Sequence, residues 1–327
     1  MARTGLAEYA FPWSLVYDYP LPGPAYRFCD IIQEEWGAQD GVRQRGVYRK
    51  RCPHHAKPWH QENVYCPYGF WGLKHVIEQP PSVLRGLDDS GEGDLRDAEH
   101  EIPGGPQLSL AVAVTRDPAL DPARVRDHLA KLQAIGRLKF DGAAPADDVT
   151  LARALLADAT LVYFLCHGKN DAQSSKPYLE IGLGNNLALH RIYPKMVQEW
   201  ANTAALPNLR GWPKRRPLVC INGCHTADLR PEQLLNFVNA FVYAGASGVI
   251  GTEIGVQVPL AIEVAERLFE KLVAGLPVGV ALYQVRWELV NKGNLLGLAY
   301  TLYALADLHI AAAAPVMAAP ALARAGT

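Results

Sequence analysis

From residue 107 onward, short apolar runs alternate with segments of helical period, and this alternation most constrains the fold. The apolar runs are continuous, as a strand buried on both faces requires, and they predict strands at 108–115, 137–142, 160–168, 217–225, 247–256 and 295–310. Apolar residues at helical spacing predict helices at 122–136, 146–158, 196–205, 231–246, 259–275 and 278–293. Such an order predicts an α/β fold, with a mostly parallel sheet that helices flank on both faces.

The chain divides by composition into three parts. Residues 1–105 are irregular and rich in aromatic residues, and we expect them to form an N-terminal extension or a small docking region. Residues 106–310 carry the alternating pattern and form the core domain. Residues 311–327 are a low-complexity stretch of Ala and Pro that we expect to be a flexible tail. With 327 residues, 49% of them hydrophobic, the chain can bury a full core.

The charge balance excludes a global electrostatic attraction to polyanions. Lys and Arg number 32 against 33 Asp and Glu, a formal net charge of −1, so neither nucleic acid nor an anionic membrane is indicated as a partner. The N-terminus lacks the pattern of a signal peptide, and no stretch of ~20 residues is apolar enough to span a bilayer. Six cysteines without a framework spacing complete the expectation of a reduced, cytoplasmic protein.

Two predicted strands end in reactive side chains. His167 follows one apolar run and Cys224 follows the next long one. Ligands of open α/β sheets bind at the carboxyl ends of strands, and a thiolate beside an imidazole is a competent nucleophile. Gly168 and the amide of Cys224 can supply two N–H groups to a carbonyl oxygen. The alternative is a buried thiol and a histidine with a structural role, and that is our interpretation of Cys166 and Cys220, which lie inside apolar runs.

Several segments, taken in order, resemble the CHAT family of caspase-like cysteine peptidases, in the clan of caspases, separases and gingipains. They are FPWSLVYD, FLCHG, LVCINGCHTADL, FVNAFVYAGASGVIGT and AERLFEKLVAGLPVGVALYQVR. The resemblance implies a caspase-like fold in which His167 is the general acid and base and Cys224 the nucleophile. It also implies that the amides of Gly168 and Cys224 form the oxyanion hole, and that no metal or organic cofactor takes part in the reaction.

The chain departs from the family pattern around its predicted specificity pocket. Glu253 and Ile254 stand where the family usually has an aliphatic residue and Trp. We predict that Glu253 binds a basic substrate residue, and the alternative is a solvated strand end. Related enzymes that prefer Arg can carry an acid at the place of Asn222, which supplies no charge here. Asp228 is a second candidate for substrate binding, and His225 either tunes the thiol of the nucleophile or faces solvent.

Family members often act in regulated defence or cell-death systems. The resemblance therefore implies specific protein substrates, an activating protein partner or subunit, and a role in antiviral defence. Two alternatives stay open: a catalytically silent caspase-like scaffold, and an effector regulated by a nucleotide messenger. The second would use the basic stretch RQRGVYRKR at 43–51, which otherwise forms a solvated basic face.

A second cluster of ligand-type residues lies in the N-terminal part. Cys52, His54, His55, His60 and Cys66 fall within 15 residues, and thiols and imidazoles suit Zn²⁺. Their spacing is not that of a well-attested zinc finger, and the alternative is a polar loop. The predicted active site includes no metal, and zinc binding by this cluster stays open at this point.

Overall fold

The structure is a computed structural model. It describes residues 11–29, 52–61, 63–81, 84–85, 94–95, 99–115, 120–140, 159–174, 176–182, 190–202, 212, 216–224 and 231–312. The predicted helix at 146–158, the basic stretch at 43–50, Arg51 and residues 313–327 of the predicted tail lie outside these ranges.

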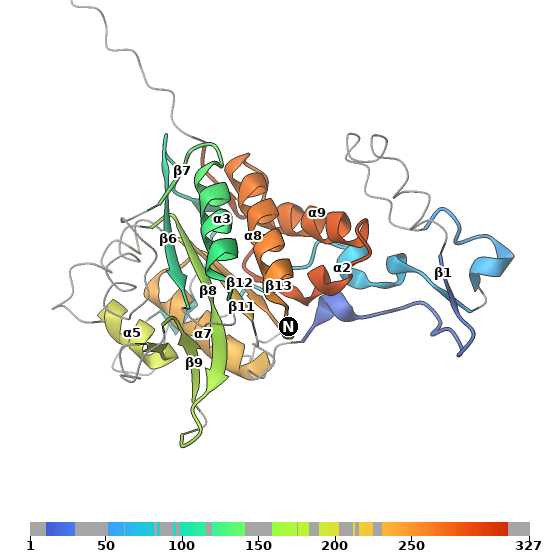
Figure 1. The fold of residues 1–327 in the computed structure, drawn as a ribbon, viewed down its shortest axis with the longest axis horizontal. Coiled ribbons are helices and arrows are strands. Elements are labelled where there is room, and N and C mark those ends of the chain that lie inside the picture. Colours follow the sequence, from blue (N-terminus) through green and yellow to red (C-terminus); the bar gives the residue numbers. More distant parts are fainter. Residues whose placement is uncertain are drawn as a thin grey trace, which may run out of the picture.

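A mostly parallel sheet forms the centre of the molecule (Figure 1). Within the described residues it has eight strands, and the parallel ones are β6 (Leu108–Val114), β7 (Leu138–Phe140), β8 (Leu161–Asn170), β11 (Leu218–Cys224) and β12 (Gly248–Thr252). β8 lies between β6 and β11, and its residues 161–166 are completely buried because helices cover both faces. The continuous apolar runs in the sequence are therefore the central strands.

Antiparallel strands complete the two ends of the sheet. β9 (Pro177–Glu180) and β10 (Arg191–Ile192) follow β8 at one end, and β13 (Tyr300–Tyr303) pairs with β12 at the other. The prediction of one strand over 295–310 is wrong. The 3₁₀ helix η7 (Leu296–Ala299) precedes β13, and β14 (His309–Ile310) leaves the sheet to pair with β5 (Glu101–Ile102). The run is apolar throughout, so its pattern does not reveal these breaks.

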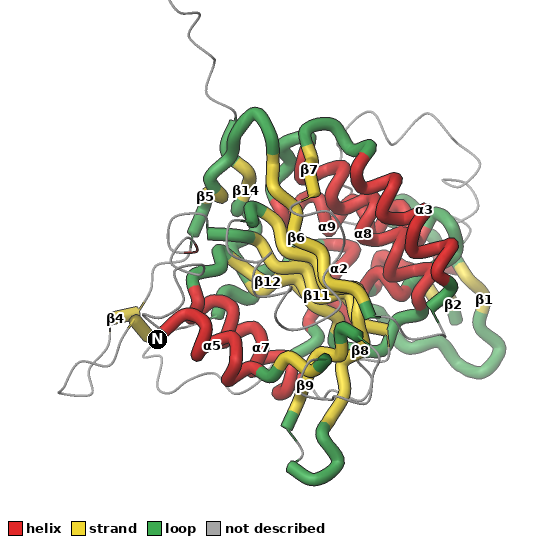
Figure 2. The backbone as a smooth tube through the Cα atoms, turned by 60° about the vertical axis from the view of Figure 1, so that its left-hand side comes forward, coloured by secondary structure: helices red, strands yellow, loops and turns green. Residues whose placement is uncertain are grey.

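Helices pack on both faces of the sheet (Figure 2). One face is covered by α3 (Pro122–Gln133), α8 (Val258–Val273) and α9 (Val278–Val290), and the other by α5 (Pro194–Asn202) and α7 (Pro231–Ala244). The sequence sets the ends of α3: Asp121 accepts a hydrogen bond from the Ala123 amide at 2.9 Å, and Gly136 takes a positive φ after the last turn. The expected α/β fold, a mostly parallel sheet with helices on both faces, is confirmed.

The N-terminal residues form a small lobe beside α9, with β1 at its far end (Figure 1). We define the N-terminal lobe as the described part of residues 11–75. It contains η1 (Trp13–Leu15), β1 (Arg27–Phe28), η2 (Pro58–Gln61), β2 (Val64–Tyr65), η3 (Pro67–Gly69) and α2 (Trp71–Lys74). After the lobe the chain runs along the sheet edge, where the Gln79 amide donates to the Leu302 carbonyl at 2.9 Å. No helix among the described residues is both long and apolar enough to cross a membrane.

Candidate active site

The register between β8 and β11 brings the two predicted strand ends together. Seven consecutive pairs join the strands, from Leu218 opposite Leu161 to Cys224 opposite His167. These two residues are therefore direct neighbours on adjacent parallel strands, although 57 positions separate them in the sequence. His167 is buried, with 3% of its surface exposed. The sheet itself thus places an imidazole-bearing residue beside a thiol-bearing one.

Alternation along β8 assigns His167 to the face that α3, α8 and α9 cover, and on β11 it assigns Asn222 to the same face. Tyr163 and Cys220 belong to the core on that face, and positions an even number of residues further along the same strands share it. Asn222 confirms the assignment, because its Nδ2 donates to the Tyr163 hydroxyl at 3.2 Å and to the Ala261 carbonyl. The Tyr300 hydroxyl donates to its Oδ1 at 2.6 Å. The buried amide therefore ties β11 to β8, α8 and β13 just before Cys224.

The backbone direction of Gly168 follows from the same alternation. The Leu165 carbonyl points toward β6 and accepts a hydrogen bond from the Thr115 amide. The Thr160 carbonyl points the other way and accepts one from the Leu218 amide of β11. In the register of these strands, odd-numbered residues of β8 bond with β6 and β9 and even-numbered ones with β11, except that the amide of Thr160, just before β8, donates to the Ser109 carbonyl. The amide of Gly168 consequently faces the β11 side of the strand, next to the end of β11 at Cys224.

A polar hairpin continues past His167. Glu180 of β9 lies opposite His167 and forms an ion pair with Lys169 at 3.2 Å. At the turn, Asp171 accepts hydrogen bonds from the amides of Ser174 and Gln173, which lower the pKa of its carboxyl, and pairs with Arg191 at 2.9 Å. The sequence analysis missed this hairpin, because β9 has only four residues and is too short to show a period. The hairpin therefore places charged, hydrogen-bonded residues on one side of His167.

Glu253 directly follows β12, the strand next to β11 in the sheet. It is only 6% exposed, so the alternative of a solvated strand end is wrong. The Tyr303 hydroxyl donates to its Oε1 at 3.2 Å, and Tyr303 belongs to the core on the α5 and α7 face. Burial raises the pKa of the Glu253 carboxyl, and the charge of Arg286 opposes that rise. This position favours a structural role, and substrate binding by Glu253 stays a prediction.

The remaining predicted residues divide into two groups. Cys166 and Cys220 are buried in the core, as interpreted from their apolar runs, and burial raises the pKa of the Cys220 thiol to about 12. Asp228 and His225 lie outside the described residues. Their predicted roles in substrate binding and in tuning the thiol therefore stay predictions.

The N-terminal lobe gathers a different set of ligand-type side chains. Cys29, Cys52, His60 and Cys66 each place a ligand atom within 4.8 Å of the others. The sequence analysis included three of them but not Cys29, and His55 is not part of the set. The pairing of β1 with β2 explains why Cys29 joins the set. Phe28 lies opposite Tyr65, and each of these two residues is followed directly by a cysteine.

The fold and the paired strand ends define an α/β protein with the groups that a cysteine hydrolase uses. Its sequence identifies the family. The CHAT domain family matches residues 94–300, and the chain belongs to that family. A probable protease of Vitiosangium sp. (strain GDMCC 1.1324) is 32% identical over 312 residues, which cover 93% of this chain. The chain spans only 38% of that relative's length.

Two solved structures are similar to part of the chain. In the separase–securin complex of Saccharomyces cerevisiae, one chain is 14% identical with a TM-score of 0.40, over 64% of this chain and 13% of that one. The Arg-specific cysteine proteinase gingipain R is 13% identical with a TM-score of 0.40, over 64% of this chain and 47% of that one.

Proposed function

We propose that the chain is a cysteine endopeptidase whose nucleophile is Cys224 and whose general acid and base is His167. The observation that carries the proposal is the register of β8 and β11, which makes these residues direct neighbours at the carboxyl ends of two central strands. Membership in the CHAT family and the protease relative support peptidase activity. The buried histidine at the end of a buried strand suits general acid–base chemistry in a site shielded from water.

The reaction proceeds through a thioester. His167 takes the proton of the Cys224 thiol, and the thiolate adds to the carbonyl carbon of the substrate peptide bond. The amides of Gly168 and Cys224 donate to the oxyanion that forms. The C–N bond then breaks as His167 returns the proton to the leaving amine. Water, deprotonated by His167, attacks the thioester carbonyl, releases the carboxylic acid product and restores the thiol.

The substrates we propose are specific proteins, cleaved in a regulated defence or cell-death pathway after activation by a protein partner. This part rests on the family resemblance. Glu253 and Asp228 are the residues proposed to select a basic residue before the cleaved bond. Cleavage of peptides with Arg, Lys or a neutral residue at that position tests the selection. If the Glu253→Ala variant cleaves them in the same proportions as the wild type, Glu253 has no role in specificity.

Labelling with a peptide-based, thiol-reactive electrophile tests the dyad directly. The probe carries Arg or Lys beside its reactive group, and wild type, Cys224→Ala and His167→Ala are compared alone and in lysate containing candidate activators. We expect labelling of the wild type and a loss of about 1,000-fold or more in either variant. Cys220→Ala is the control, because it removes a thiol from the same strand without touching the dyad.

The outcomes separate the proposal from its alternatives. Labelling of Cys224 that does not depend on His167 means an exposed thiol without a working dyad. A Cys224→Ala variant that keeps all biological activity favours a silent scaffold. Thermal stabilisation of the chain by a nucleotide favours the nucleotide-regulated effector.

A further inference from the structure

We propose that Cys29, Cys52, Cys66 and His60 bind one zinc ion, which holds the N-terminal lobe together. This site is separate from the dyad, and the inference does not depend on the proposed peptidase activity.

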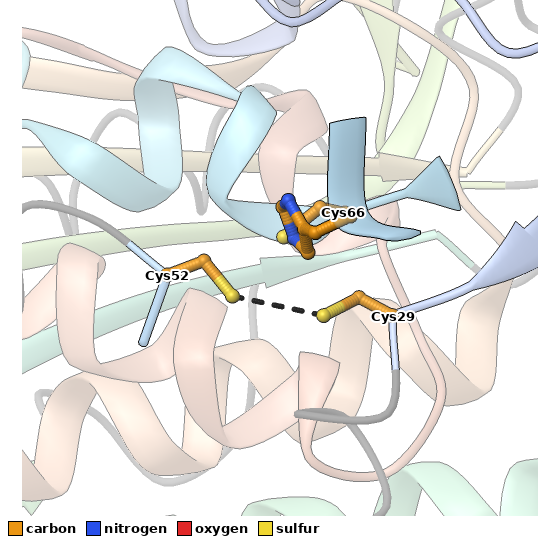
Figure 3. Close-up of side chains that lie close together, drawn as sticks. Cys29, Cys52 and Cys66 are labelled. Atoms are coloured by element: carbon orange, nitrogen blue, oxygen red, sulfur yellow. Dashed lines mark hydrogen bonds between the residues drawn. The ribbon is translucent and has the colours of Figure 1, made fainter. Parts of the chain in front are cut away.

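The distances fit a single tetrahedral ion. Zinc binds sulfur at about 2.3 Å and imidazole nitrogen at about 2.0–2.1 Å, so two ligand atoms at a tetrahedral angle lie roughly 3.5–3.8 Å apart. The Sγ atoms of Cys29 and Cys52 are 3.6 Å apart, and all four ligand atoms fall within 4.8 Å of one another. In Figure 3 the sulfur atoms of Cys29 and Cys52 point toward each other, with Cys66 beside them. A disulfide would need about 2.05 Å.

The four ligand residues are buried, so water does not supply their hydrogen bonds. Cys29, Cys52, His60 and Cys66 are each 5% exposed or less. The Nε2 atom of His60 has no hydrogen-bond partner among the described residues, although its surface is inaccessible to solvent. A buried polar nitrogen without a partner is unfavourable, and coordination to a metal ion would supply the missing partner. The structure thus supplies an imidazole nitrogen within reach of three sulfur atoms.

The surroundings of Cys52 suit a thiolate ligand. The His54 amide donates to the Cys52 Sγ at 3.4 Å, and a hydrogen bond of this kind stabilises negative charge on sulfur. The His54 ring lies beside the set, with Nδ1 3.8 Å from the Cys29 Sγ. We assign the fourth ligand to His60 because its nitrogen, unlike that of His54, lies within reach of all three sulfur atoms.

The apolar cluster around the ligands is small. Three of the five buried residues in the hydrophobic cluster that contains the ligands are the cysteines themselves, and the others are Val64 and Tyr68. The four ligands come from the ends of β1 and β2, from η2 and from the turn before η2. One ion would therefore cross-link every segment around this cluster, as structural zinc does in domains too small for a full core. Because protein fills all four positions, the ion has a structural role.

Metal analysis of the full chain tests the proposal. The chain is purified under reducing conditions from cells grown with zinc, and its metal content is measured by inductively coupled plasma mass spectrometry. We expect about one zinc ion per chain in the wild type and background levels in Cys29→Ser and His60→Ala. His55→Ala is the matched control, because it removes a neighbouring imidazole outside the set and should keep the ion.

A rescue variant separates ligation from folding. His60→Cys supplies a fourth thiolate, so it should keep zinc where His60→Ala loses it. Cobalt substituted for zinc should give the intense thiolate-to-metal absorption and the visible bands of a tetrahedral site. A wild type with only background zinc, a Cys29→Ser variant that keeps its zinc, or iron and sulfide in place of zinc would each overturn the proposal.

Discussion

At the residue scale, a line of buried polar groups leads from α3 and α8 to the strand end before Cys224. His128 is 1% exposed, and its ring nitrogens lie 3.0 Å from the Glu266 Oε1 and 3.1 Å from the Tyr163 hydroxyl. Tyr163 in turn accepts from Asn222, which is bonded to Tyr300. Such a network favours one position of the end of β11, because a buried polar group that loses a hydrogen bond does so at a cost in free energy.

His128 makes stability depend on pH. Burial lowers its pKa below the ordinary 6.5, although Glu266 opposes the shift and Lys131 adds to it. The unfolded chain therefore takes up a proton first as the pH falls below about 6.5, and the free energy of unfolding decreases until the pH has passed the folded-state pKa. We expect His128→Gln to lose less stability than the wild type between pH 7 and about 5, measured by urea unfolding.

The control for that measurement is His100→Gln, which removes an imidazole whose side chain is 66% exposed. A His128→Gln variant with the same dependence of stability on pH as the wild type would contradict the prediction.

At the element scale, one guanidinium joins three parts of the fold at the edge of the sheet. Arg286 of α9 donates to the Tyr300 carbonyl of β13 and, at 3.4 Å, to the Gly72 carbonyl of α2. It is completely buried, and burial lowers its pKa to about 10. The negative charge of Glu253, which directly follows β12, opposes this decrease in the pKa of Arg286, because it stabilises the charged guanidinium. The two buried charges therefore depend on one another.

A double-mutant cycle tests this dependence. Arg286→Met leaves the Glu253 carboxylate buried without its opposite charge, so we expect a loss of about 3–5 kcal/mol in the free energy of unfolding at pH 7. Adding Glu253→Gln should restore part of it, with a coupling of about 1 kcal/mol or more in urea unfolding. If the two single effects simply add, the charges are independent and the structural role of Glu253 is wrong.

The sequence predicted the elements whose pattern is unambiguous. The strands at 160–168 and 217–225 are long, continuous and apolar, and they are β8 and β11. The hairpin of β8 and β9 and the break before β13 were missed, because very short strands and uniform apolar runs give no period to follow. The neighbourhood of Cys29 and Cys66 could not be read from spacing along the chain, since it depends on the pairing of β1 with β2.

At the scale of the whole molecule, the N-terminal lobe and the sheet domain are joined through α9. Trp287 contacts both apolar clusters of the lobe, its Nε1 donates to the Leu73 carbonyl at 3.1 Å, and its ring centroid lies 4.9 Å from that of Tyr68. The sheet domain has two large cores of its own. The lobe, in contrast, depends on this contact and on the proposed zinc.

Removing the metal should therefore loosen the lobe and leave the sheet intact. Hydrogen exchange with and without a strong chelator measures both in one experiment. We expect amides of residues 52–70 to exchange at least about 10-fold faster after chelation, while those of β6, β8 and β11 keep their protection. Unchanged exchange in 52–70 would show that packing alone holds the lobe.

The pairing of β8 with β11 also limits how the proposed peptidase can be regulated. Sliding Cys224 past His167 by one residue would break all seven pairs between the strands and turn each buried side chain of β11 to the opposite face. The register of the sheet therefore fixes the positions of Cys224 and His167 relative to each other along the two strands. If the proposed peptidase has an activator, we expect that partner to act by changing which molecules can reach Cys224 and His167.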